Sequence, residues 1–317
     1  MTKSIFKQKN LLYFLLNLLG IIIFVAFLDF CIGSLLNTYY YKIKSGTIAL
    51  TTYSIEKTSA DIVIFGSSRA SHHYQPNIFE NTLKLTCYNV GKDGERSTLY
   101  HFAVLEGILK RYTPKIIILD FLNGEFGKTL YTYDMLSSLT PYYSNHPEMR
   151  NIIELRSKFE KLKLLSKIYQ FNSLGFSIIA DRVNLRSSPK EDIRGYIPII
   201  SPKYITAPIA EFDYTKPYDL DSTKINIYRA FVKTCIEKKI KLYIVSSPYY
   251  LKAIGEDNSV KIAKEIASQY NVPFIDMAYE NFFIEKPYLF YNYMHLNDSG
   301  AKIFSTTLAK KIVENAK

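Results

Sequence analysis

The sequence is poor in cysteine, with only three among its 317 residues. Cys31, Cys87 and Cys235 are too few and too far apart to form a disulfide framework, and their spacing is not that of a metal site. We expect buried free thiols at Cys87 and Cys235, with a bond between these two as the alternative. The sequence therefore predicts neither a metal site nor a cofactor.

A dense block of lysine and arginine is also absent, although the formal net charge is +11. Short basic patches occur at residues 158–167 and 237–241, and both resemble solvated helix faces or ends. Nucleic-acid-binding proteins gather their basic residues on one face or stripe. No nucleic-acid partner is therefore expected, whereas diffuse positive charge suits anionic lipid or an acidic polysaccharide.

The N-terminal region contains a long apolar run. Residues 11–28 have only Asn17 to interrupt them, and the apolar character continues to about residue 36, with Asp29 near the outer end. About 20 apolar residues are needed to span a bilayer. A cleaved signal peptide is the alternative, but its apolar region would be shorter and followed by small residues, which are missing before Cys31. We predict an uncleaved transmembrane anchor over residues 11–36.

The charges that flank this run predict its orientation. Lys3, Lys7 and Lys9 precede it without any acid, which favours a cytoplasmic N-terminus, while Lys42 and Lys44 beyond it make the bias modest. Residues 1–10 would then be a cytoplasmic tail of a single-pass membrane protein. The chain beyond the anchor would be periplasmic or extracellular, beginning with a connector at 37–60 that has at most one short strand.

Apolar strands and helical patterns alternate from residue 61 onward. The predicted strands are 61–66, 86–91, 115–120, 241–248 and 272–277. The predicted helices are 77–84, 95–112, 222–239, 258–270 and 297–316. This alternation predicts a parallel sheet with helices on both faces, within one domain covering 61–317.

Residues 121–221 interrupt the alternation. They contain many tyrosines, several prolines and a helical stretch at about 147–168. A structureless loop of this length is uncommon, so we interpret the segment as an insertion. Either it covers or extends the site, with aromatic side chains that stack on sugar rings, or it serves only packing and turns.

Small and polar residues follow the first predicted strand, in Gly66-Ser67-Ser68. They are typical of an ordinary turn, or they present Ser68 as a nucleophile at the sheet edge where sites of such folds lie. A nucleophilic serine needs a base and donors for an oxyanion. Of five histidines, His295 is the best placed, in a loop after the last strand. The others are less suited, being neighbours in sequence or lying within a helix or the insertion: His72, His73, His101 and His146.

Four short motifs in this order resemble the SGNH (GDSL-like) hydrolases. Gly66-Ser67-Ser68 matches their first block, with Ser68 at the nucleophile position. Asn89–Gly94 matches the second, and Gly94 falls on the glycine whose N–H serves the oxyanion. The resemblance covers about residues 61–120 and 241–316. It implies a flavodoxin-like three-layer α/β sandwich with a parallel sheet of about five strands.

The third and fourth blocks depart from the family pattern. Asn123 is the candidate for the asparagine oxyanion donor, but the usual Gly-x-Asn-Asp is absent. The last block has His295 where the family has its base, but Asn292 in place of the acid. Asp298 is a second candidate for the acid, and it is alternatively the cap of the last helix.

The anchored layout is similar to one group within the family, the membrane-anchored SGNH proteins of polysaccharide and cell-wall operons, such as D-alanyl-transfer and alginate O-acetylation proteins. The shared closing segment is His295–Ala301. The resemblance implies a serine esterase or acyltransferase that acts on an acylated carbohydrate or lipid-linked glycan, beside a multispanning acyltransferase. The alternative is a catalytically decayed fold that binds glycans or serves as a scaffold.

Overall fold

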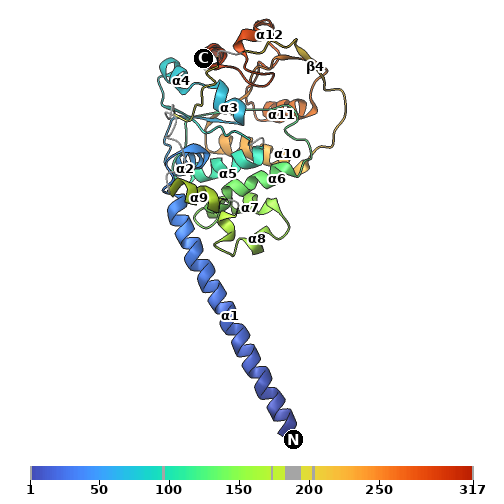
Figure 1. The fold of residues 1–317 in the computed structure, drawn as a ribbon. Helices are drawn as coiled ribbons and strands as arrows, with labels where there is room; N and C mark the ends of the chain where they lie inside the picture. Colours follow the sequence, from blue (N-terminus) through green and yellow to red (C-terminus); the bar gives the residue numbers. More distant parts are fainter. Residues whose placement is uncertain (1, 95–96, 173, 183–193, 202–203, 316–317) are drawn as a thin grey trace. The chain divides into compact units, whose positions relative to one another are not determined.

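The computed structural model describes residues 2–94, 97–172, 174–182, 194–201 and 204–315 (Figure 1). The chain divides into two compact units. The smaller unit combines Met1–Ile43 with Ser137–Ser187, and the larger combines Lys44–Leu136 with Ser188–Lys317.

The larger unit is built on a parallel sheet of five strands. In sheet order the strands are β2 (Cys87–Asn89), β1 (Ile62–Phe65), β3 (Ile116–Asp120), β5 (Lys241–Ser246) and β7 (Phe274–Asp276). All of them run in one direction, so their carboxyl ends meet at a single edge. The predicted α/β class with a parallel sheet of about five strands is confirmed.

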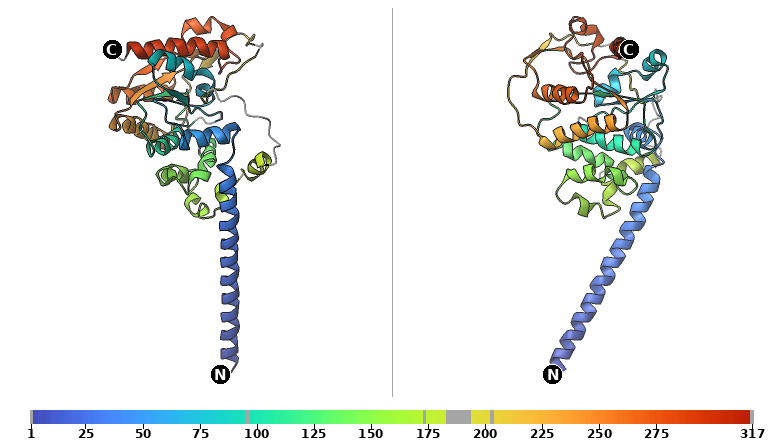
Figure 2. Two further views of the ribbon diagram at one scale, coloured as in Figure 1. Left: turned by 90° about the vertical axis from the view of Figure 1, so that its left-hand side faces the viewer. Right: turned by 180° about the vertical axis from the view of Figure 1, so that it is seen from behind.

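Helices cover both faces of this sheet (Figures 1 and 2). One face carries α5 (Thr98–Leu109), α10 (Ser222–Glu237) and α11 (Asn258–Gln269), and the other carries α3 (Ser68–His73), α4 (Pro76–Leu83) and α13 (Asp298–Glu314). Phe65 of β1 packs edge-on against Phe231 of α10, with ring centroids 5.6 Å apart. On the opposite face, Tyr74 packs against Phe304 of α13 at 5.0 Å. Ile62 and Ile64 of β1 belong to the core cluster that contains Tyr74 and Phe304. The β1 side chains therefore alternate between two apolar layers, as expected for a strand buried on both faces.

The connector before β1 differs from the expectation of a mixed segment with at most one strand. Residues Gly46–Glu56 form helix α2, which buries Ile48 and Ile55. Thr51 of this helix lies 3.4 Å from the hydroxyl of Tyr100 in α5. The apolar residues recur at helical spacing, and packing on α5 stabilises the helix.

Shorter elements complete the larger unit. They are α6 (Tyr131–Asp134), α12 (Asn281–Ile284), η5 (Pro287–Leu289) and a separate parallel pair, β4 (Ala210–Asp213) with β6 (Leu251–Ile254). Cys87 lies in β2 and Cys235 in α10, both buried and unpaired. The prediction of buried free thiols is confirmed.

The smaller unit joins helix α1 (Thr2–Tyr40) to part of the predicted insertion. The helical stretch expected at 147–168 consists of short pieces, η2 (Pro147–Met149), α7 (Arg150–Ile153), η3 (Glu154–Arg156) and α8 (Glu160–Lys163). Before and after these pieces come η1 (Met135–Tyr142), η4 (Tyr169–Phe171) and α9 (Gly175–Arg182). Tyr40 is buried between rings of Tyr142 and Phe171, at 5.7 and 5.8 Å.

The apolar part of α1 is long enough to cross a membrane. It runs over Lys9–Tyr40, and its most apolar 18-residue window has a mean hydropathy of 2.7 with no buried residue. A signal sequence near an N-terminus has the same properties. Length and composition therefore fit a span, and the orientation stays a prediction.

Candidate active site

A sharp turn after β1 brings Ser68 to the carboxyl edge of the sheet. Gly66 has φ +149°, and a Cβ there would lie only 2.8 Å from the Cβ atoms of Ala70 and Asp120. Ser67 then caps helix α3, accepting a hydrogen bond from the N–H of Arg69. Ser68 is partly exposed, whereas its two neighbours are buried. The turn therefore presents Ser68 and not Ser67.

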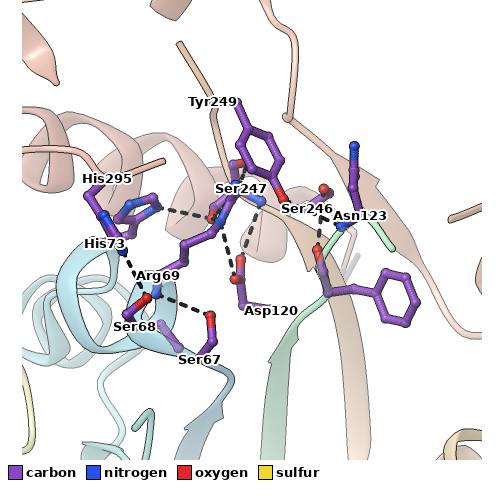
Figure 3. A network of polar contacts seen from close by, with 12 residues as sticks. Ser67, Ser68, Arg69, His73, Asp120, Asn123, Ser246, Ser247, Tyr249 and His295 are labelled. Carbon is purple, nitrogen blue, oxygen red and sulfur yellow. Dashed lines mark hydrogen bonds and ion pairs between the residues drawn. The ribbon is translucent and has the colours of Figure 1, made fainter. Parts of the chain in front are cut away.

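His295 lies against Ser68, as the sequence predicted. Its Nε2 is 2.8 Å from the Ser68 Oγ (Figure 3), and its Nδ1 is 3.1 Å from Oδ1 of Asn292. The same Oδ1 accepts bonds from the backbone N–H groups of Met294 and His295, both at 2.9 Å. These two donors identify that atom as the amide oxygen, so Nδ1 carries the proton. The lone pair of Nε2 therefore faces the serine hydroxyl, the arrangement a general base requires.

The Asp298 carboxylate has two hydrogen-bond partners of its own. It accepts hydrogen bonds from the Tyr196 hydroxyl at 2.8 Å and from Nε2 of Gln75 at 3.0 Å. The expected capping role is also wrong, because Asn297 accepts the bond from the N–H of Gly300 and Asp298 is the first helical residue. The side chain that orients His295 is therefore the neutral amide of Asn292.

His72 and Asp93 lie next to the site, although the sequence analysis judged His72 less suited as the base and did not single out Asp93. The ring centroid of His72 is 5.5 Å from that of His295. Nδ1 of His72 bonds the carbonyl of Ile197 at 2.7 Å, and its Nε2 lies 3.3 Å from the Asp93 carboxylate. Burial works to raise the pKa of Asp93, but the hydrogen bond and charge of His72 outweigh it and lower that pKa. If residues 68–73 had been predicted as a helix, His72 would have been expected beside Ser68, because residues four apart lie on one face of a helix.

His73 fixes the loop that carries His295. Its Nε2 accepts the backbone N–H of Leu296 at 3.0 Å, so its Nδ1 carries the proton and donates to the Ser247 hydroxyl at 3.0 Å. Burial, with the charge of Arg69 beside it, lowers the pKa of His73 well below its ordinary value. His73 is therefore a neutral positioning residue that joins α3 to the residue after His295.

A buried ion pair lies directly behind Ser68. Arg69 is 1% exposed, its Nε is 3.6 Å from Asp120, and its guanidinium stacks on Tyr249 at 3.4 Å (Figure 3). It also donates to the hydroxyl and carbonyl oxygens of Ser247. Burial raises the pKa of Asp120, which accepts a 2.6 Å bond from Tyr74. These contacts fasten α3 to the ends of β3 and β5.

Gly94 and Asn123, the predicted oxyanion donors, differ in how they lie. Gly94 has φ +82° and open space where a Cβ would be, in the turn after β2. The Asn123 side chain points away from Ser68, beyond the Asp120 and Ser247 pair in Figure 3, and its Nδ2 donates to the Tyr279 hydroxyl. Asn123 is therefore not brought to Ser68, and its role stays a prediction that requires the amide to leave Tyr279.

Asn89, which begins the second motif, has a structural role. Its Nδ2 donates to the carbonyls of Ala70 and Tyr74 at the end of α3, at 2.7 and 3.0 Å. Its Oδ1 accepts from the N–H of Gly91, a residue whose Cβ would lie 2.6 Å from the backbone nitrogen of Ser71. The asparagine and the glycine together hold the loop after β2 against α3.

One end of the predicted insertion borders the site. The carbonyl of Ile197 accepts from His72, the N–H of Ile197 donates to Ser71, and Ile199 accepts from the N–H of Asp298. No group of three or more metal-ligating side chains occurs in the part of the chain that the structure describes. The chemistry available here is that of a serine, a histidine and backbone donors.

The comparisons with known proteins give structural likeness without sequence likeness. No family model and no curated protein matches the sequence. A two-domain esterase (CEX) active on acetylated mannans is similar with a TM-score of 0.38 and 11% identity, over 78% of this chain and 47% of that one. The chain thus spans about half of the length of that esterase.

Two further solved structures are similar to this chain. The acetyl xylan esterase AlAXEase has a TM-score of 0.37 and 11% identity, over 81% of this chain and 100% of that one. A protein of Bacteroides fragilis NCTC 9343, provisionally named an acylhydrolase, has a TM-score of 0.35 and 12% identity, over 81% and 88% of the two chains. All three carry the description of an esterase or acylhydrolase.

Proposed function

We propose that this chain is a membrane-anchored serine esterase or acyltransferase of the SGNH type, working through an acyl-serine intermediate. The observation that carries the proposal is the contact of 2.8 Å between Ser68 Oγ and His295 Nε2, with Asn292 holding Nδ1 as the protonated nitrogen. Proton transfer to a positioned base is what turns a serine hydroxyl into a nucleophile. Burial of Ser67 leaves Ser68 as the reactive hydroxyl of the pair.

In the first step, Ser68 Oγ attacks the ester carbonyl and its proton passes to His295 Nε2. The carbonyl oxygen becomes an oxyanion, for which the N–H groups of Ser68 and Gly94 are the assigned donors. The N–H of Ser68 has no intrahelical acceptor, because it belongs to the first turn of α3. Asn123 would join them only after giving up its bond to Tyr279. Collapse expels the alcohol, which takes the proton back from His295.

In the second step, the acyl group leaves Ser68. Water or an acceptor hydroxyl gives its proton to His295 and attacks the acyl carbon, and the proton then returns to Ser68 Oγ. Water yields a free acid, and a sugar hydroxyl yields a new ester. Transfer requires an acceptor groove that excludes water.

The proposed substrate is an acylated carbohydrate or lipid-linked glycan outside the cytoplasm. The apolar helix α1 supports an anchor, the three lysines before it support an inward N-terminus, and the SGNH resemblance supports the substrate class. A multispanning membrane acyltransferase is the proposed partner. A reporter enzyme that is active only outside the cytoplasm should be active when it is fused after Lys317. Protease added to intact spheroplasts should digest the domain, and protection of the domain would contradict this topology.

A fluorophosphonate probe, which phosphonylates activated serines, tests the site. Wild type should be labelled, Ser68→Ala and His295→Ala should not, and Ser67→Ala should keep most of the labelling. Circular dichroism should show all variants folded. Loss of labelling in Ser67→Ala alone would move the nucleophile by one residue.

A second candidate function is glycan binding by a decayed site. The observation in its favour is the neutral Asn292 where a carboxylate would stabilise the imidazolium. Absence of labelling in both wild type and Asn292→Asp would favour it.

A further inference from the structure

The first charged residue after the apolar run of α1 is tied to the insertion. Between Lys9 and Asp29 the sequence has no charged residue. The Asp29 carboxylate accepts three hydrogen bonds, from the Ser166 hydroxyl at 2.6 Å and from the N–H groups of Lys167 and Ile168 at 2.7 and 3.2 Å. One carboxylate of α1 thus accepts the hydrogen bonds of the donors at the start of the turn that leads into η4.

A glycine one turn further along α1 lets the same segment approach closely. A Cβ at Gly33 would collide with the backbone carbonyl carbon of Lys167, at 2.6 Å, and with the backbone nitrogen of Ile168, at 2.9 Å. Asp29 and Gly33 are four residues apart and so lie on one face of the helix. Residues 166–168 are therefore fastened to α1 just beyond its apolar run.

The segment that ends in this attachment exposes apolar side chains at every third position. Phe159, Leu162, Leu165 and Ile168 are exposed by 61%, 66%, 74% and 37%. We call these four residues the 159–168 patch. Exposed apolar residues gathered in one place mark an interaction site on a soluble surface.

Exposed cations lie among these apolar residues. Lys158 and Lys161 are exposed. The acid of the segment, Glu160, is buried and accepts from Arg156 at 2.8 Å and from Ser157 at 2.6 Å. Burial works to raise the pKa of Glu160, but these bonds and the charge of Arg156 lower it. The outward charge beside the patch is therefore positive, the sign that anionic lipid headgroups attract.

The length of the apolar run fixes the depth of this attachment. Nineteen uncharged residues, 10–28, separate Lys9 from Asp29. At about 1.5 Å per residue they extend about 28 Å, close to the roughly 30 Å thickness of a bilayer's hydrocarbon core. These residues alone can cross the core, which shortens the predicted span of 11–36 to about 10–28. Asp29 would then lie at the membrane–water boundary, and the segment bonded to it would lie at the same level.

We propose that the 159–168 patch inserts into the headgroup region of the bilayer that α1 crosses, with Lys158 and Lys161 at anionic headgroups. The inference rests on the membrane anchor of the proposed function. It differs from a contact with a second protein, because apolar side chains flanked by lysines at the depth of a span boundary are the features of interfacial lipid binding. The patch and α1 would together hold the smaller unit against the membrane surface.

The test uses the full chain in vesicles of phosphatidylcholine with phosphatidylglycerol. Cys31 is replaced by serine, and the buried Cys87 and Cys235 are left in place because they are not accessible to the label. One accessible cysteine then replaces Leu162 in the patch, Ile22 in the run or Asn151 in α7, and each carries a nitroxide. Oxygen, which concentrates in lipid, and a water-soluble nickel chelate report the surroundings of each label. The Leu162 label should favour oxygen over nickel several-fold, as at Ile22, while exposed Asn151 should favour nickel.

The possible results separate the patch from the anchor. If Ile22 favours oxygen but Leu162 favours nickel, the anchor stands and the docking is wrong. If Leu162 is shielded from both reagents, a protein surface covers it and the lipid proposal is equally overturned. If Ile22 favours nickel, the anchor itself fails, and the docking with it.

The charge component has its own measurement. Lys158→Gln with Lys161→Gln should lower the oxygen preference at Leu162 in vesicles with phosphatidylglycerol and change little in pure phosphatidylcholine. An equal response in both lipids would overturn the role of anionic headgroups.

Discussion

The two sides of helix α3 differ in how they use charge. Its outward side presents Ser68 to His295, and the side chain that orients that histidine is the neutral amide of Asn292. Its inward side buries Arg69 against Asp120 and Tyr249. Ser68 and Arg69 are adjacent in the sequence, yet one belongs to the reactive surface and the other to a charged interior.

The difference indicates that charge stabilises the geometry of this site more than its chemistry. Ser68 stands on a six-residue helix, which has little stability of its own. Arg69, His73 and Asn89 tie this helix to β5, to the His295 loop and to the loop after β2. Variants of the inward side should therefore lower the free energy of unfolding, whereas variants of the outward side should change the activity.

The largest effect is expected for Arg69→Met. It removes one partner of a buried ion pair and leaves Asp120 uncompensated, which costs about 3–5 kcal/mol of unfolding free energy. Denaturant unfolding of the detergent-solubilised chain measures it. Ser68→Ala, on the outward side of the same helix, is the matched control and should change stability little.

A double variant sharpens this prediction. Arg69→Met with Asp120→Asn should cost less than the two single variants summed, because the second change removes the uncompensated charge. Additive costs would show that the two side chains do not act as a pair, and the contrast between the two sides of α3 would lose its basis.

The next largest effect is expected for Asn292→Asp. A carboxylate of the same shape keeps the three bonds of Oδ1 and adds a negative charge beside the imidazolium. Such a neighbour shifts a pKa by about 1–3 units, so turnover should rise about tenfold or more, with the acid limb of the pH profile moved upward. Measurement of kcat against pH tests both.

Asp298→Asn is the control for that variant. Asp298 bonds Tyr196 and Gln75, so its loss should leave turnover nearly unchanged. If Asp298→Asn lowers turnover and Asn292→Asp does not raise it, the acid of the site is Asp298 after all.

The strands and the closing helix could be predicted because local pattern determines them. Buried parallel strands are continuous apolar runs, and α13 has a regular helical period. Helix α2 was missed because its segment, 46–56, contains three threonines and a glycine and so gives a weak helical signal. Packing on α5 stabilises this helix more than its own composition does. The grouping of residues 137–187 with α1 in one unit could not be predicted, since it depends on contacts between segments that are far apart in the sequence.

The pairing of Ser68 with His295 could be predicted from the sequence, because the carboxyl ends of parallel strands meet at one edge of the sheet. The residues around this pair could not be predicted, because helix α3 is too short to give a periodic signal in the sequence. Without it, His72 and His73 are only neighbours of the serines, and Arg69 is an unremarkable residue in a turn. Asn123 follows β3 as expected, but the Tyr279 hydroxyl, 156 residues away, determines its direction.

A smaller effect concerns pH and His73. Because its pKa in the folded protein lies well below 6.5, unfolding below pH 6.5 takes up a proton, and stability falls as the pH falls. The loss is about 1.4 kcal/mol per pH unit for each such group. His101, buried with a pKa of about 3, makes the same kind of contribution to the pH dependence of stability. It is unchanged when His73 is replaced and so serves as an internal reference.

His73→Gln isolates that contribution, since a glutamine oxygen can accept the N–H of Leu296. Denaturant unfolding at several pH values between 5 and 6.5 should show a slope shallower by one proton than in wild type. An unchanged slope would mean that His73 becomes protonated in the folded state, contrary to its burial.

The smallest effect is expected at the edge of the outward side, for Asp93→Asn. The folded-state pKa of Asp93 is below its ordinary value of 3.8, so the carboxylate stays ionised throughout an assay from pH 5 to 8. Nδ1 of His72 already donates to Ile197, so its contact with Asp93 requires a second proton and makes the ring a cation. Without Asp93 that cation faces the imidazolium that forms on His295 and disfavours it. An ion pair as exposed as this one contributes at most about 1 kcal/mol, so kcat/KM should fall by up to about fivefold. Asp61→Asn, at the opposite end of β1, is the control and should leave kcat/KM unchanged. A fall in the free energy of unfolding together with the loss of kcat/KM would mean that Asp93 acts by holding the loop after β2 and not by its charge.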